Sequence, residues 1–137
     1  MQQVFDLETQ KARPRETADS LRKSRAWQYL SERDRTILEM VEKGLSHRLI
    51  GQAIGLNAGT VSRRLALIRT RLMSPLAKLA LDPSTPLPAD CRETARLHAI
   101  TGLSLREISR TRRLPLHAVT DHVRFAQGVA RGMTARR

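Results

Sequence analysis

The chain has few aromatic residues, a single cysteine and few lysines. Its 137 residues include one Trp, one Tyr, two Phe and one Cys, and 21 of its 25 basic side chains are Arg. A single cysteine excludes an intrachain disulfide framework, which favours a reducing compartment, and we expect Cys91 to be a small buried apolar residue. The sequence has no apolar run of transmembrane length and no signal-peptide core. We therefore expect a cytoplasmic protein with no membrane partner.

The balance of charge and aromatic rings favours double-stranded nucleic acid as a partner. Basic residues outnumber acidic ones by 25 to 13, for a net charge of +12. Arg is a better bidentate partner than Lys for phosphate and for guanine edges, so the excess favours nucleic acid. Proteins that bind single strands stack bases on several aromatic rings, which are scarce here. The excess is +2 over residues 1–29, +4 over 30–73 and +6 over 74–137, so it belongs to the folded body.

Residues 44–72 have the pattern of a short helix, a tight turn and a longer basic helix. Gly44 is the residue type that ends a helix, and Ser46 can accept a hydrogen bond from the free amides of a new first turn. This short helix is expected to end at Gly55, which permits a positive φ, and Asn57 can cap the next helix. The sequence therefore predicts a sharp corner on each side of the short helix.

The longer helix has an apolar face and a polar face. Val61, Leu65, Ile68 and Leu72 follow one another at spacings of four, three and four, which is typical of one buried helical face. Small and basic side chains share the opposite face: Asn57, Ala58, Gly59, Ser62, Arg63 and Arg69. Such a face suits a helix that comes close to an acidic partner.

The flanking segments complete the plan of the first half of the chain. We interpret residues 1–14 as an arm and residues 15–30 as a leading helix. Ser31 can cap the next helix, and the Asp34 carboxylate can reach back to the free amide at its start. The segment 82–88 holds three prolines and predicts a linker. The apolar stripe of the capped helix consists of Ile37, Leu38 and Val41.

The corner at Gly44 occurs a second time. Residues 102–108 match residues 44–50 at an offset of 58, with five of seven positions identical. In the second copy Ser104 and Glu107 have the spacing of a capping box, and residues 90–100 supply a preceding helix. This internal repeat predicts two similar helical modules, one after the other.

We therefore predict an all-α protein of about seven or eight helices in two tandem helix-turn-helix modules. Residues 1–29 form an N-terminal arm and leading helix, and residues 30–81 form the first module. Residues 82–88 are the proline-rich linker, and residues 89–137 are the second, divergent module.

The first module also resembles a known family. The residues that carry the resemblance are Leu30-Ser31-Glu32-Arg33-Asp34-Arg35, Gly44-Leu45-Ser46, Ile50, Gly55-Leu56, Thr60-Val61 and Leu65. They are similar to the helix-turn-helix in the promoter-reading C-terminal domain of bacterial sigma factors and in the related LuxR-type regulators. The family has a small residue where its second helix packs tightly, and this position is Gly51 here. The same module serves many regulators, so the resemblance implies a fold more closely than a biological role.

The resemblance implies that the third helix enters the major groove of DNA. Arg63 is then the best candidate for a bidentate guanine contact, worth about 1–3 kcal/mol of discrimination. The base-facing candidates are Asn57, Ala58, Gly59, Ser62 and Arg63, and Thr60 joins them on the DNA-binding helix. The candidates for phosphate contacts are Ser46, His47, Arg48, Arg64 and Arg69.

The second copy departs from this pattern. Arg113 replaces the turn glycine, Arg112 occupies an apolar position, and Asp121 stands where Arg63 stands in the first copy. An aspartate can accept a hydrogen bond from cytosine, but it repels phosphate. Two interpretations stay open: the second module contacts DNA, or it has become a surface for a protein partner. The DNA-contact candidates are Arg106, Arg110, Arg112, Arg113, His117, Thr120 and Arg124.

The residue patterns favour a binding protein and predict no enzyme, metal or cofactor. His117 and His122 are five positions apart, which is not a same-face helical spacing, and the sequence has no nucleophile motif. We expect sequence-specific binding of double-stranded DNA to regulate transcription in the nucleoid, by a monomer or a homodimer. Two alternatives stay open. One is an adaptor that binds RNA polymerase or another transcription protein, and the other is a sequence-indifferent architectural DNA-binding protein.

Overall fold

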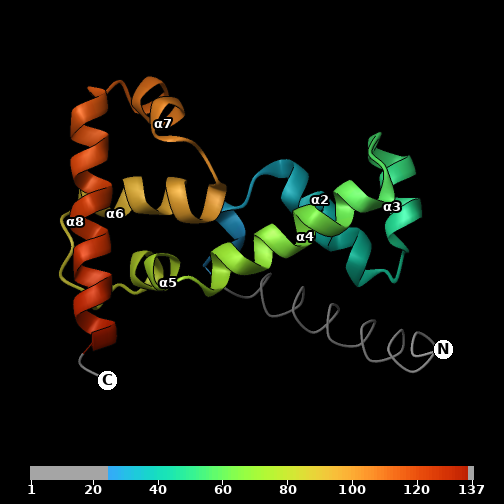
Figure 1. Ribbon diagram of the computed structural model, residues 1–137, viewed down its shortest axis with the longest axis horizontal. Helices are drawn as coiled ribbons and strands as arrows, with labels where there is room; N and C mark the ends of the chain where they lie inside the picture. Colours follow the sequence, from blue (N-terminus) through green and yellow to red (C-terminus); the bar gives the residue numbers. More distant parts are fainter. Residues whose placement is uncertain (1–24, 136–137) are drawn as a thin grey trace. The chain divides into compact units, whose positions relative to one another are not determined.

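The computed structural model describes residues 25–135, and every regular element in this range is helical (Figure 1). This confirms the predicted all-α fold. In chain order the elements are η1 (Trp27–Tyr29), α2 (Glu32–Glu42), α3 (His47–Ile54), α4 (Ala58–Met73), α5 (Pro75–Leu81), α6 (Ala89–Arg96), η2 (Leu97–Thr101), α7 (Leu105–Arg112) and α8 (Leu116–Ala135). The predicted arm, and most of the predicted leading helix, lie outside the described residues.

The chain divides into two compact units, Met1–Ile68 and Arg69–Arg137, and the division falls inside α4. The sequence predicted a division at the proline-rich segment 82–88, but this segment lies within the second unit. The Arg92 guanidinium donates to the carbonyl oxygens of Asp82 and Thr85, each at 2.6 Å, and Thr85 is buried. Arg92 therefore fastens the segment to α6 as an ordered loop.

The predicted helix starts are confirmed where a polar side chain caps the first turn. Ser31 caps α2, Ser46 caps α3, Asn57 caps α4 and Ser104 caps α7. In each case a side-chain oxygen accepts a hydrogen bond from the backbone amide three residues later, over 2.8 to 3.2 Å. Because these bonds are local in sequence, the sequence alone was sufficient to place them.

The internal repeat is visible in the backbone. Gly44 and Gly102 end their helices with φ of 85° and 87°. After α3 the amide of Leu56 donates to the carbonyl of Gly51 at 2.8 Å, and after α7 the amide of Leu114 donates to Ser109 at 3.0 Å. Both pairs of equivalent residues are 58 positions apart. The chain therefore takes the same local path through both copies of the corner and turn.

Gly51 marks the closest approach of the chain in the first copy. A Cβ atom at this position would lie 2.2 Å from the carbonyl oxygen of Leu56, which is backbone and cannot rotate away. The equivalent residue of the second copy is Ser109, whose side chain forms a hydrogen bond at this place. Its hydroxyl donates to the carbonyl oxygen of Leu114 at 2.5 Å. In the first copy the backbone at this place packs against a glycine that has no side chain, and in the second copy it accepts a hydrogen bond from a serine.

The two units have cores of different composition. In the first unit the predicted stripes of α2 and α4 are buried: Ile37, Leu38, Val41, Val61, Leu65 and Ile68. Leu72, the last residue of the predicted α4 stripe, belongs to the second unit and is half-buried. In the second unit α5 and α6 lie against each other and against α8 (Figure 1). Small side chains allow this close packing, and the core cluster consists of Leu79, Ala80, Ala95, Ala126 and Ala130. Cys91 is buried as predicted, and burial, with a smaller effect of Asp90, raises the pKa of its thiol.

Replacement of Gly51 by Ala tests the close approach. We expect Gly51→Ala to lower the free energy of unfolding by about 1–3 kcal/mol, because the methyl group displaces the backbone of Leu56. Gly128→Ala is the matched control, since a Cβ there meets no atom within 4 Å in an exposed helical position. It should raise stability by up to about 1 kcal/mol through helix propensity. Denaturant unfolding measures both, and equal effects of the two changes would contradict the assignment.

The capping box of α7 predicts a pH dependence. Hydrogen bonds from the Ser104 backbone and side chain lower the pKa of Glu107 below its ordinary value. A lowered pKa means that the folded state prefers the carboxylate, so this contribution to stability is present above the ordinary pKa. It is lost as the pH falls through the lowered value. NMR titration should give a midpoint for Glu107 that Ser104→Ala moves upward, and an unmoved midpoint would show that the box is not formed in solution.

Candidate nucleic-acid interface

The outer face of α4 is formed by exposed small and basic side chains. Gly59, Ser62, Arg63 and Ala66 are exposed, and so is Arg69 further along the helix. The opposite face, with Val61 and Leu65, is buried against the first unit. The structure therefore presents the predicted polar face of this helix to solvent.

A short chain of hydrogen bonds orders the beginning of this face. The Asn57 side chain accepts from the Thr60 amide at 2.8 Å, and the Thr60 hydroxyl accepts from Arg63 Nη2 at 3.1 Å. Gly59 lies between the two longer side chains, because a Cβ there would be 3.4 Å from Asn57 Oδ1 and 3.5 Å from Arg63 Nη1. A guanidinium has five N–H donors, so the bond to Thr60 leaves donors for another partner. The first turn of α4 therefore holds Arg63 at an open surface.

The start of α3 also reaches this face. His47 Nδ1 and Ser62 Oγ are 2.6 Å apart, and both residues are exposed. This bond joins a residue predicted to contact phosphate with one predicted to face bases. Ser46 and Arg48, on either side of His47, are exposed as well. The structure thus brings the predicted residues of α3 next to those of α4.

Arg64 points in a different direction from its neighbour Arg63. Its Nε donates to Asp34 Oδ1 at 2.8 Å, and this carboxylate is fully buried while the Arg64 side chain is 32% exposed. The sequence predicted that Arg64 contacts phosphate and that the Asp34 carboxylate accepts a hydrogen bond from the free amide at the start of α2. Ser31 caps that helix as predicted, whereas the Asp34 carboxylate pairs with Arg64 of α4. Arg64 is therefore a residue that fastens the helix to the first unit.

A sequence signal for this pair did exist. Asp34 lies three and four positions before Ile37 and Leu38, so it shares the helical face that these buried residues define. A carboxylate on an apolar stripe needs a charged or hydrogen-bonding partner when the helix packs. What the spacing could not supply was the identity of that partner, which is 30 residues away.

The second unit uses two of its predicted contact residues internally. Arg112 donates to the backbone and side chain of Asp90 and to the Thr94 hydroxyl, at 3.1 to 3.3 Å. The Thr120 hydroxyl donates to the carbonyl oxygen of Leu116 at 3.0 Å. The remaining candidates are exposed: Arg106, Arg110, Arg113, His117 and Arg124. Both terminal nitrogens of Arg112 are therefore engaged within the second unit.

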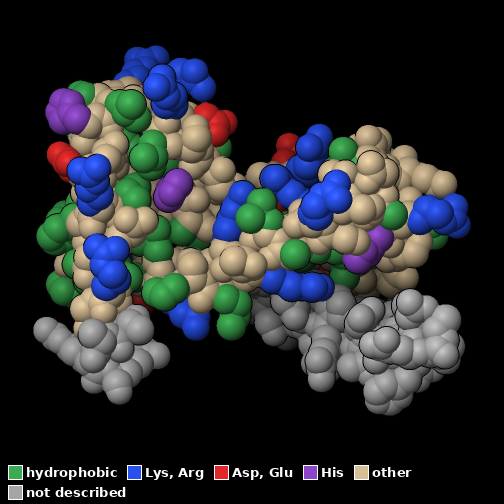
Figure 2. All heavy atoms as spheres, in the orientation of Figure 1, with side chains coloured by type: hydrophobic (Ala, Val, Ile, Leu, Met, Phe, Trp, Pro, Cys, Tyr) green, Lys and Arg blue, Asp and Glu red, His purple; other side chains and the backbone are tan. Residues whose placement is uncertain are grey.

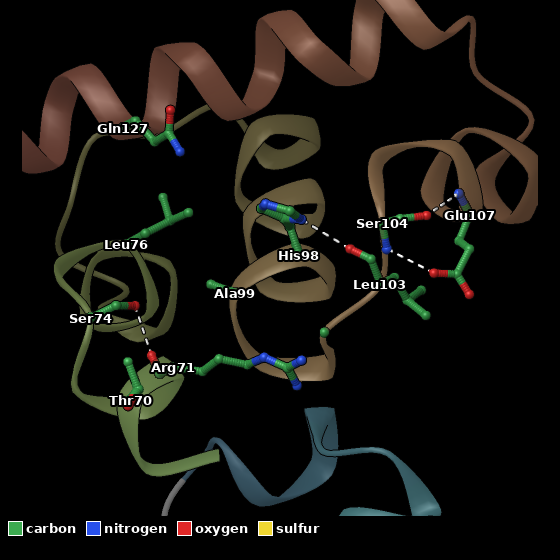
Figure 3. Close-up of a pocket in the computed structure, with 11 residues that line it drawn as sticks. Thr70, Arg71, Ser74, Leu76, His98, Ala99, Leu103, Ser104, Glu107 and Gln127 are labelled. Atoms are coloured by element: carbon green, nitrogen blue, oxygen red, sulfur yellow. Dashed lines mark hydrogen bonds between the residues drawn. The ribbon is translucent and has the colours of Figure 1, made fainter. Parts of the chain in front are cut away.

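The second unit also contains a groove of about 510 Å³ (Figure 3). Leu76, His98 and Gln127 are among its lining residues. Two polar residues around it take part in structural bonds: His98 Nδ1 bonds to the carbonyl of Leu103 at 2.9 Å, and Ser104 belongs to the capping box. These bonds hold the corner before α7. Among residues 25–135, no three His, Cys, Asp or Glu side chains are grouped as metal ligands would be.

None of the helices in the described part of the chain is long and apolar enough to cross a membrane. Comparison with protein-family models, with curated proteins and with solved structures finds no match to this chain. Its function is therefore argued from the side chains that the fold presents.

The ion pair between Asp34 and Arg64 predicts an asymmetry between its two partners. Arg64→Met keeps the apolar stem but leaves the buried carboxylate without its guanidinium, which should cost about 3–5 kcal/mol of unfolding free energy. Asp34→Asn should cost only about 1–2 kcal/mol, because the amide oxygen still accepts and Arg64 can also reach water. Arg33→Met, at an exposed position of α2, is the control and should stay within about 0.5 kcal/mol. Urea unfolding decides between this order and equal costs, which would mean that the pair does not hold α4.

Proposed function

We propose that the protein binds double-stranded DNA sequence-specifically through the outer face of α4 and regulates transcription. The observation that carries this proposal is the arrangement of two adjacent arginines. Arg64 is bound to a buried carboxylate, whereas Arg63 is exposed beside Asn57, Gly59 and Ser62. An α-helix fits the major groove, where each base pair presents a distinct set of donors and acceptors.

The residues of this face match the chemistry of base edges. Arg63 can donate two parallel hydrogen bonds to O6 and N7 of guanine, and Asn57, whose Oδ1 caps α4, keeps its Nδ2 to donate to a base edge. Gly59 and Ala66 add little bulk, which lets the helix approach the floor of the groove. The order of α2, α3 and α4, with a corner at Gly44 and a turn at Gly55, supports the resemblance to the helix-turn-helix of sigma factors and LuxR-type regulators.

Contacts to phosphate would position the helix rather than select a sequence. Ser46, His47 and Arg48 lie at the start of α3 next to the α4 face, and Arg69 extends that face toward the end of the helix. Arg64 is held to Asp34 through its Nε, and because its side chain is 32% exposed, its other donors keep it among the phosphate candidates. The proposed interface thus has one base-reading helix and a neighbouring group of phosphate contacts.

Selection of bound duplexes from a random library at a fixed salt concentration tests the proposal. We expect the wild type to enrich a motif that contains guanine, and Arg63→Ala to lose preference at one position of it. The loss should be about 1–3 kcal/mol of discrimination. Arg33→Ala removes the same charge from an exposed position of α2 and should leave the motif unchanged.

Other outcomes of the selection experiment would favour one of the two alternatives or contradict the role of α4. A wild type that enriches no motif and binds all duplexes equally would favour the architectural alternative. Copurification with RNA polymerase without DNA binding would favour the adaptor. If Arg63→Ala leaves both motif and affinity unchanged, α4 does not read bases in the way proposed.

A further inference from the structure

The two copies of the repeat carry their positive charge on different helices. At three equivalent positions the first copy has Arg48, Gln52 and Gly55, and the second copy has Arg106, Arg110 and Arg113. On the following helix the first copy has Arg63 where the second has Asp121. Charge is therefore concentrated on α7 and the turn after it in the second unit, and on α4 in the first.

The three arginines of the second copy form one exposed row, which we name the α7 arginine ridge. Arg106 and Arg110 are four positions apart on one face of α7, and Arg113 follows in the turn before α8. All three residues are exposed. Figure 2 shows a group of Lys and Arg side chains over α7 and this turn, at the top of the view.

The three arginines of the ridge form no ion pairs with other described residues. The neighbouring Arg112 turns inward to Asp90 and Thr94, but in the described part of the chain no carboxylate lies within ion-pair distance of the three ridge guanidiniums. The acid on the same helix is Glu107, whose carboxylate accepts from the Ser104 amide at 2.9 Å and is near enough for the charge of Arg110 to help lower its pKa. The guanidiniums of these three exposed residues, with about five N–H donors each, are therefore available to an outside partner.

The backbone at Arg113 adds an independent observation. Arg113 has φ of 55° and is the only non-glycine residue with positive φ in residues 25–135. This conformation costs an L side chain free energy that glycine avoids, and the first copy has Gly55 there, with φ of 78°. Because Arg113 is exposed, burial of its side chain does not offset this free-energy cost. A contact made outside the unit would compensate for the strain.

The outer face of α8 is less suited to phosphate or base contacts than that of α4. Asp121 is exposed there between His117 and Arg124, which are exposed as well, together with Phe125, which is 51% exposed. A carboxylate on this face repels the DNA backbone, whereas the α7 arginine ridge attracts it. Within the second unit, the α7 arginine ridge therefore offers phosphate three exposed arginines, whereas the outer face of α8 sets Asp121 beside His117 and Arg124.

We propose that the α7 arginine ridge is a sequence-indifferent clamp for the phosphates of duplex DNA. This inference rests on the proposed function, in which α4 reads the bases. The first unit then supplies specificity, and the second supplies affinity that depends strongly on salt. The two copies of one corner have divided these tasks by moving arginines between equivalent positions.

The double variant Arg110→Gln/Arg113→Gly tests the clamp, because it restores the residues of the first copy at both positions. Binding of the full-length protein would be measured to a selected duplex and to an unrelated duplex, over about 50–200 mM salt. We expect both affinities to fall by a similar factor, roughly tenfold to a hundredfold near 0.1 M salt. The slope of log K against log salt should fall in magnitude by about 2. The thermal midpoint should not fall, since glycine relieves the strain at position 113.

Lys78→Gln/Arg131→Gln is the matched control, since it removes two exposed charges from elsewhere in the second unit. Its affinity and salt slope should stay close to those of the wild type. An equal loss in the control, or no loss in the Arg110→Gln/Arg113→Gly variant, would overturn the clamp. A loss confined to the selected duplex would overturn it too, because the second unit would then read bases. A wild type that binds every duplex equally would refute specific recognition by α4 and leave the clamp standing.

Discussion

The ion pair between Asp34 and Arg64 determines how the first unit presents α4. Successive residues of an α-helix are about 100° apart, so the helix cannot turn one side chain inward without fixing the direction of the next. With Arg64 held at 2.8 Å from a buried carboxylate, Ser62 and Arg63 are directed to solvent. Burial of that carboxylate is costly, and the bond to Arg64 offsets the cost only in this orientation of α4. The exposed face therefore follows from an interaction on the opposite side of the helix.

In the second unit, different side chains hold the helix that is equivalent to α4. The residue equivalent to Asp34 is Arg92, and the residue equivalent to Arg64 is His122, so an ion pair of the first kind is impossible there. His122 Nδ1 lies 3.0 Å from the Thr94 hydroxyl on α6, while Arg92 binds the carbonyls of the loop after α5. The hydrogen bond between His122 and Thr94 joins α6 and α8, the first and last helices of the second copy. Arg92 organises the loop 82–88 that precedes α6.

The sequence predicted those features of the fold and site that depend on near neighbours. Ser46, Asn57 and Ser104 cap helices through bonds to amides three residues away, and the stripe from Val61 to Ile68 is a helical period. The roles of Arg64, Arg112 and segment 82–88 depend on partners 10 to 30 residues distant. From the sequence, an arginine on a helix is predicted to be a surface charge. Only the packed structure shows whether a carboxylate lies close enough to pair with it. Prolines likewise indicate a loop without indicating what holds it.

Similarity between the two copies says little about what each one binds. Gly51 and Ser109 accommodate one backbone path by leaving space in one case and by donating a hydrogen bond in the other. Gly55 and Arg113 occupy the same left-handed position, although only the first does so without strain. The scaffold therefore accepts different side chains at equivalent places, and the surface is free to diverge. For this reason a function assigned to α4 does not transfer to α8 by symmetry, and each unit has to be interpreted from the charges it exposes.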